Sequence, residues 1–197
     1  MYKKYNIVVI IFLFFSIFAN GQKMLGYVEV HGVVKDGIRP LENVHVEIYA
    51  NNTLLKIELA EITGDFSFIL ELNRNYKIKF AKEFYVSKFV EFNTNVLENE
   101  LGIWSFHFVV ELFPDVPELD YSFLKIEPVG KIHYNKTYGE FDHLVDYTLY
   151  MQQKIAQLMD SYNAKRNQYY QDLIEEADKL YQNKKLILKL ISLFYRY

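Results

Sequence analysis

The sequence predicts a seven-stranded β-sandwich followed by a C-terminal α-helical extension, and three observations carry this prediction. Apolar and polar residues alternate between residues 27 and 112, which is the pattern of strands with one buried face. Turn-forming residues interrupt this alternation at short intervals. After Gly139 the chain contains neither glycine nor proline up to Tyr197, and so long a stretch without helix breakers favours helix.

Seven segments account for the alternation. The expected strands lie at residues 27–35, 44–49, 54–62, 66–72, 76–80, 86–92 and 104–112. Because no helical stretch separates them, we expect two antiparallel sheets packed face to face. Burial of the large inward side chains, at roughly 1.5 to 3 kcal/mol each, offsets the loss of chain entropy. The aromatic side chains of these strands are therefore explained as core.

Glycine, proline and aspartate mark the turns between these strands. Gly64 with Asp65 suits a tight turn between the third and fourth strands, where a positive φ is required. Pro40 fixes φ in the first connection. Turns and core packing account for every position of this structural turn motif, which comprises Gly32, Gly37, Pro40, Gly64 and Asp65.

The same residues carry a resemblance to a known family. The matching segments are Gly32-Val33-Val34 with Asp36-Gly37, Pro40-Leu41 with Asn43-Val44-His45-Val46, Thr63-Gly64-Asp65-Phe66-Ser67-Phe68, and Tyr76-Lys77-Ile78 leading to Phe84-Tyr85-Val86. Over about residues 27–112 the chain resembles the carboxypeptidase regulatory-like domain, a transthyretin-like β-sandwich common in exported proteins of Bacteroidetes. It departs from the family pattern at Asn75 and Phe84, where glycine is common. The resemblance implies an accessory module and no peptidase activity.

The N-terminus has the pattern of an export signal. Lys3 and Lys4 precede an apolar run from Ile7 to Ala19, and cleavage after Gly21 would leave Gln22 as the new terminus. The alternative is a retained membrane anchor. A helix of this run would reach only about 20 Å, whereas the hydrocarbon core of a bilayer is about 30 Å thick. We therefore expect an exported protein, periplasmic or associated with the outer membrane.

Four segments follow from these patterns: a signal peptide at 1–21, the sandwich at 22–113, a proline-punctuated connector at 114–140, and a helical region at 141–197. Residues 131–134 of the connector could form one more short strand. A capping box formed by Thr137 and Glu140, or a cap at Asp142, is expected to open the helix. An unbroken helix would be about 80 Å long, so we expect a long helix over 141–182 and a break near Asn183, with Asn163 as a second candidate for a break.

Apolar residues recur along the helical region at spacings of three and four. This seam is expected to pack on a partner surface without being a strict coiled coil, and its candidate docking residues are Met151, Ile155, Leu158, Tyr162, Leu173, Leu180, Ile187 and Ile191. The last segment, Lys184–Tyr197, is basic and amphipathic. It could lie on an anionic membrane surface, and the alternative is that it folds back on the long helix.

Composition and motifs argue against several kinds of chemistry. The chain has no cysteine, which excludes disulfides, a thiol nucleophile and a thiolate metal site. A net charge of -3 gives no basic footprint for nucleic acid. The sequence shows no catalytic, phosphate-binding or dinucleotide-binding pattern. His143 and Asp146 would share one helical face as the only metal-like pair of this region, but a third ligand is lacking. We expect no cofactor and no enzyme activity.

These observations lead to two hypotheses about function. The first is an exported, non-enzymatic binding or scaffold protein of the cell envelope, with the helical region as a partner-docking arm. The alternative is an accessory module that binds a small ligand such as a glycan through outward tyrosines, for which Tyr27, Tyr49 and Tyr85 are candidates.

Overall fold

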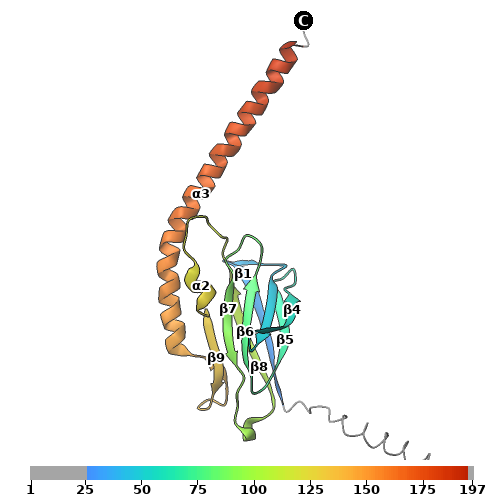
Figure 1. Cartoon of the computed structure of the whole chain (residues 1–197), viewed down its shortest axis with the longest axis vertical. Helices are drawn as coiled ribbons and strands as arrows, with labels where there is room; N and C mark the ends of the chain where they lie inside the picture. The colour runs from blue at the N-terminus through green and yellow to red at the C-terminus, as the bar shows by residue number, and fades with distance from the viewer. Residues whose placement is uncertain (1–25, 195–197) are drawn as a thin grey trace, which may run out of the picture.

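A computed structural model of the chain describes residues 26–194 and shows two β-sheets with one long C-terminal helix (Figure 1). The expected signal peptide lies outside the described residues. The elements in chain order are β1 (Tyr27–Asp36), β2 (Arg39–Pro40), β3 (His45–Ala50), β4 (Thr53–Leu59), β5 (Asp65–Glu71), β6 (Asn75–Ala81), β7 (Lys88–Asn93), η2 (Glu98–Glu100), β8 (Ile103–Glu111), α2 (Ser122–Ile126), β9 (Gly130–Asn135), β10 (Glu140–His143) and α3 (Val145–Phe194).

The strands form one sheet of four and one of six. In the smaller sheet β1 is central and pairs with β2, β5 and β8. The larger sheet has the order β10-β9-β7-β6-β3-β4. Most pairs are antiparallel, but β1 with β8 and β7 with β9 are parallel, which corrects the expectation of purely antiparallel sheets.

The two sheets enclose a shared aromatic core. Phe66 of β5 lies with its ring centroid 5.2 Å from that of Phe80 of β6, in the opposite sheet, and 5.5 Å from that of Phe108 of β8. Buried and exposed residues alternate along β5 and β8, as the sequence predicts. The arrangement is therefore sandwich-like, with inward side chains of both sheets meeting in one core.

Strands occur at all seven predicted positions, but the predicted count is too low. Residues 26–194 contain ten strands, because β2, β9 and β10 are added to the seven. The strand β9 covers the segment at 131–134 that the sequence marks as strand-like. The hairpin of β9 and β10 extends the larger sheet beyond β7, so part of the expected connector belongs to the sheet.

The predicted start of the helix at Phe141 is wrong. Residues 140–143 form β10, and neither Thr137 with Glu140 nor Asp142 caps a helix, since α3 begins at Val145. The physical reason is Phe141, which is buried and packs its ring 5.5 Å from that of Phe92 in the core. Burying one aromatic side chain in the sandwich outweighs a local capping preference.

The predicted break near Asn183 is also wrong, as is the second candidate at Asn163. The helix α3 runs without interruption for 50 residues, a length of about 75 Å at 1.5 Å per residue. Its first part lies beside α2 and β9, and its second part projects beyond both sheets (Figure 1). Nothing in the sequence of α3 breaks the helix, because asparagine is tolerated in a helix and residues 145–194 contain no proline or glycine.

Candidate functional site

The first part of α3, residues 145–169, packs on a second hydrophobic cluster beside the sandwich core. We call residues 145–169 the packed half. Tyr162 is fully buried and its ring centroid lies 5.0 Å from that of Phe113. Residues of the chain between β8 and β9 supply most of the cluster, whose buried members are Val86, Phe113, Val116, Tyr121, Leu124 and Tyr162. The segment expected to be a connector therefore provides the surface on which the helix lies.

Polar contacts fix the start of the packed half. The Tyr147 hydroxyl donates to the carbonyl oxygen of Pro128 at 2.7 Å, and the Tyr150 hydroxyl donates to a carboxylate oxygen of Glu127 at 2.9 Å. Lys154 forms an ion pair with the same carboxylate, and this hydrogen-bonded pairing lowers the pKa of Glu127. These contacts tie the first turns of α3 to the segment that follows α2.

The burial of α3 ends at Tyr169. We call residues 170–194 the arm. Every side chain that the structure describes from Tyr170 to Ile191 is exposed, and Leu180 is 64% exposed where Tyr162 is 0% exposed. Eight large apolar side chains nevertheless continue at helical spacing on one face, which we call the arm stripe, and Leu186 is exposed on the opposite face. The stripe comprises Tyr170, Leu173, Ile174, Leu180, Tyr181, Ile187, Leu188 and Ile191.

The structure divides the predicted docking residues into two groups. Met151 and Tyr162 are buried, and Ile155 and Leu158 are partly buried against the second cluster. The other four, Leu173, Leu180, Ile187 and Ile191, are exposed in the arm. The prediction of one continuous docking seam is therefore wrong for its first half, which is covered by the protein's own chain, and docking by the second half stays a prediction.

Sequence reasoning missed part of the arm stripe. Tyr170, Ile174, Tyr181 and Leu188 were not among the candidates, although each is exposed. The signal that finds them is their spacing of four or seven residues from one another, which places them along one side of the seam. Their inclusion makes the stripe wider than a strict coiled-coil seam.

The residues of the turn motif lie at turns, strand ends and close backbone approaches. Gly64 has a φ of 76°, and a Cβ there would clash with the carbonyl oxygen of Val34. Gly32 lies so close to β8 that a Cβ would meet the carbonyl oxygen of Phe108. Gly37 lies in the β1–β2 turn, Pro40 ends β2 and Asp65 begins β5.

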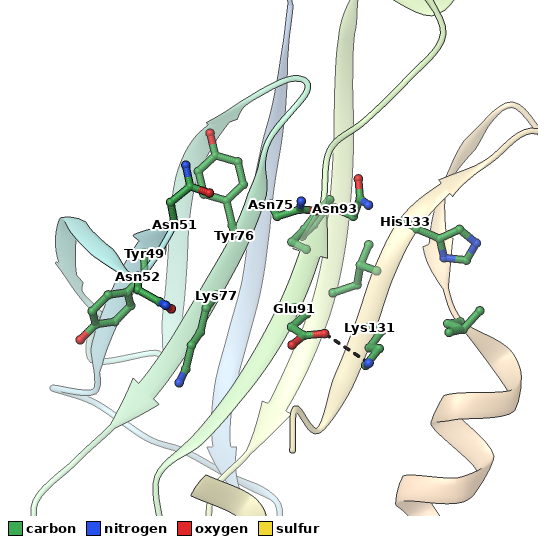
Figure 2. Close-up of a pocket in the computed structure, with 13 residues that line it drawn as sticks. Tyr49, Asn51, Asn52, Asn75, Tyr76, Lys77, Glu91, Asn93, Lys131 and His133 are labelled. Carbon is green, nitrogen blue, oxygen red and sulfur yellow. Dashed lines mark ion pairs between the residues drawn. The ribbon is translucent and has the colours of Figure 1, made fainter. Parts of the chain in front are cut away.

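A pocket of about 500 Å³ lies over the six-stranded sheet (Figure 2). Its lining mixes polar and apolar side chains from β3, β6, β7, β9 and the β3–β4 turn, with an ion pair of 3.4 Å between Glu91 and Lys131 at its centre. Among the three tyrosines proposed for ligand binding, Tyr49 lines this pocket. Tyr27 starts β1 in the other sheet, and the Tyr85 hydroxyl donates to Asp36 at 3.2 Å, so the structure does not gather the three into one site.

A second pocket, of about 430 Å³, lies between β8 and the packed half, and Lys88 and His143 are in its lining. Lys88 is 6% exposed. Its ammonium donates to the carbonyl oxygen of Glu111 at 2.6 Å and lies 4.4 Å from the Phe113 ring centroid. Burial lowers the pKa of Lys88 to about 8 and also lowers the pKa of His143.

The metal-like pair of the sequence is not assembled as predicted. His143 ends β10 and Asp146 lies in the first turn of α3, so the two do not share a helical face. Within residues 26–194, no group of three or more histidine, aspartate or glutamate side chains is placed to hold a metal ion. In the same range, no helix combines the length and hydropathy needed to cross a bilayer.

Comparisons with known proteins place the chain in no family. No protein-family model matches it, and no curated protein matches it. Among solved structures it is similar to 3-chlorocatechol 1,2-dioxygenase from Rhodococcus opacus 1CP, at 14% identity and a TM-score of 0.33, over 45% of this chain and 60% of that one. It is also similar to a DUF3823 family protein from Parabacteroides merdae ATCC 43184, at 16% identity and a TM-score of 0.34, over 45% and 47% of the two chains.

The chain thus spans 60% or less of the length of these two structures. At such TM-scores neither similarity carries an argument about family or activity. The functional argument therefore rests on the molecule's own surfaces.

Proposed function

We propose that the protein is an exported, non-enzymatic binding or scaffold protein of the cell envelope, and that the arm is its docking element. One observation carries this proposal: along the second half of α3 the arm stripe is apolar and exposed, with Lys184 as its one charged interruption. Exposed apolar faces of this kind mark interaction sites in soluble proteins. An amphipathic helix that docks by one face is a recurrent mode of protein recognition.

Two features of the sequence support the envelope as its location. The apolar run from Ile7 to Ala19 after Lys3 and Lys4 is the pattern of an export signal. The resemblance of the sandwich to the carboxypeptidase regulatory-like, transthyretin-like domain is part of the same proposal, since that module accompanies exported proteins.

The arm can be tested by adding charge to one of its faces. Leu180→Glu with Ile187→Glu places two carboxylates in the stripe, whereas Gln171→Glu with Gln182→Glu places two on the opposite face of the same helix. Tagged full chains carrying each pair are compared with the wild type for recovery of envelope proteins. We expect the stripe variant to lose them and the opposite-face variant to keep them; equal recovery by all three chains would contradict the proposal.

Peripheral membrane contact through Lys184–Tyr197 is a variant of this proposal. The described part of that segment is basic, with Lys184, Lys185 and Lys189 and no acidic residue. Binding to anionic vesicles would then weaken when Lys184 and Lys185 are replaced by Glu. Unchanged co-sedimentation of that variant would argue against a membrane role.

A glycan-binding accessory role is the second candidate, and the pocket over the six-stranded sheet favours it. Tyr49 offers an aromatic side chain beside the amide of Asn52, and the amides of Asn51 and Asn75 also line the pocket (Figure 2); amides with aromatic rings suit hydroxyl-rich ligands. Glycan-array binding that is lost in Tyr49→Ala and kept in Tyr27→Ala would support it. A blank array for the wild type would remove this support.

A further inference from the structure

Charge is segregated along the arm. Residues 172–178 carry Asp172, Glu175, Glu176 and Asp178 without a basic residue, and residues 184–189 carry Lys184, Lys185 and Lys189 without an acidic one. Between them Lys179 reaches back to Glu175 at 3.9 Å, and both side chains are exposed. The arm therefore has an acidic segment followed by a basic segment along the same apolar stripe.

We propose that the arm of a second copy of this chain covers the arm stripe in an antiparallel orientation. This inference rests on the proposed function, in which the arm is the docking element, and names its partner. In an antiparallel pair the acidic segment of each arm faces the basic segment of the other. In a parallel pair like charges would lie side by side, which is unfavourable.

The register of the two paired arms follows from the positions of their charged segments, and it agrees with the length of helix that is exposed. A two-fold axis between the acidic and basic segments crosses the arm at the level of Gln182 along the helix, which is also the midpoint of the arm as described. Asp178 of one copy then lies nearly level with Lys185 of the other, and Leu173 lies level with Ile191. Two such contacts arise from each pairing because the interface is isologous.

The shape of the molecule permits this pairing. The arm projects beyond both sheets, so no part of the described body covers it (Figure 1). It is about 37 Å long at 1.5 Å per residue. In the antiparallel register the two bodies lie at opposite ends of the paired arms, and the described end of each arm reaches the start of the other copy's arm.

Cysteine mapping tests the orientation, and the chain has no cysteine of its own to interfere. Near the axis, Tyr181→Cys is expected to form a disulfide-linked dimer of the full chain on mild oxidation. Leu173→Cys alone and Ile191→Cys alone are expected to remain unlinked, because in the antiparallel register identical positions lie about 27 Å apart. An equimolar mixture of these two variants is expected to link. Gln182→Cys, on the opposite face, is the matched control and should not link.

Charge reversal tests the register independently. Asp178→Lys or Lys185→Asp alone should weaken the dimer by roughly tenfold or more, since each change affects two symmetric contacts. The two changes combined in one chain should restore the dissociation constant to within about threefold of the wild type. Sedimentation equilibrium of the full chain measures this.

Each alternative outcome has a distinct meaning. Linking of Leu173→Cys alone and of Ile191→Cys alone would show a parallel pair and overturn the proposal. A chain that stays monomeric and links at no position also overturns it, and the proposed function then stands if the stripe variant still loses its envelope partners. A monomer that floats with phosphatidylglycerol vesicles would assign the stripe to a membrane surface instead.

Discussion

The two halves of α3 have the same apolar periodicity and different environments. Along the packed half the apolar side chains meet Phe113 and the cluster around it, and Tyr162 is fully buried. Along the arm the same spacing leads to exposed side chains such as Leu180. Periodicity thus indicates that a helix has an apolar face, and what covers that face depends on the rest of the molecule.

The difference lies in the chain between β8 and β9. This segment contributes Phe113, Val116, Tyr121 and Leu124, and all four are buried. It extends far enough to cover the packed half and no further (Figure 1). The arm is therefore the part of α3 for which the protein itself supplies no covering surface among the described residues.

The largest expected effect comes from truncating the buried tyrosine of the packed half. Tyr162→Ala should lower the free energy of unfolding by about 3 to 5 kcal/mol, because it removes a large buried ring and leaves a cavity. Tyr162→Phe is the informative control. The Tyr162 hydroxyl has no hydrogen-bond partner among the described residues, so its removal should be neutral or stabilising by up to about 1 kcal/mol. Urea denaturation measures both, and a large loss in Tyr162→Phe would contradict this account.

The next effect is a pH dependence of the free energy of unfolding that arises from Lys88, whose ammonium lies against Phe113 of the same cluster. Its pKa is lowered by burial to about 8 from 10.5. Between these two values the unfolded chain binds a proton that the folded chain does not, so stability should rise with pH by up to about 3 kcal/mol. Below pH 8 Lys88 is protonated in both the folded and the unfolded chain, and the full free-energy cost of burying its charge is present.

Lys88→Met removes this titration. The difference in free energy of unfolding between Lys88→Met and the wild type should therefore shrink or change sign across the same pH window. Lys88→Met also loses the hydrogen bond from Lys88 to the carbonyl oxygen of Glu111 at every pH. A difference that stays constant from pH 8 to pH 10.5 would show that Lys88 is solvated in the folded protein.

A smaller effect is expected at the start of the packed half. Tyr147→Phe removes the hydrogen bond to the carbonyl oxygen of Pro128 and should cost about 1 kcal/mol. Thr148→Val is a suitable comparison, because the Thr148 hydroxyl donates locally, to the carbonyl oxygen of Leu144 just before α3. If Tyr147→Phe costs no more than Thr148→Val in thermal unfolding, the hydroxyl does not anchor the helix.

The smallest effect on stability is expected in the arm. Leu180→Ala should change the free energy of unfolding of the monomer by less than about 0.5 kcal/mol, because its side chain is exposed. The same substitution should weaken self-association measurably, since it removes apolar surface at the centre of the paired arms. A loss of stability comparable to that of Tyr162→Ala would mean that the arm packs on the body.

The sequence predicts the sandwich strands well because alternation and turn residues are local signals. Gly64 is an example, since its positive φ follows from the turn that it must make. Of the hairpin of β9 and β10, the sequence analysis finds only β9. The strand conformation at Phe141 depends on its core partner Phe92, which lies far away in the sequence. The helix break was predicted from length alone, on the assumption that an apolar face must be covered by the same chain.

The candidate site shows the same limit. The spacing of Leu173 and Leu180 identifies an apolar face, and the structure is needed to show that Met151 and Tyr162 on the same seam are covered. The segregation of acidic and basic residues in the arm is visible in the sequence. Its meaning becomes clear only when the arm is known to be one exposed, unbroken helix.

Amide hydrogen exchange along α3, measured at several protein concentrations, tests the central claim most directly. We expect the packed half to be protected at every concentration, because its cover belongs to the same chain. The described arm should be protected only at concentrations where the chain self-associates and should exchange rapidly on dilution. Protection of the arm that equals that of the packed half and does not change on dilution would contradict the account.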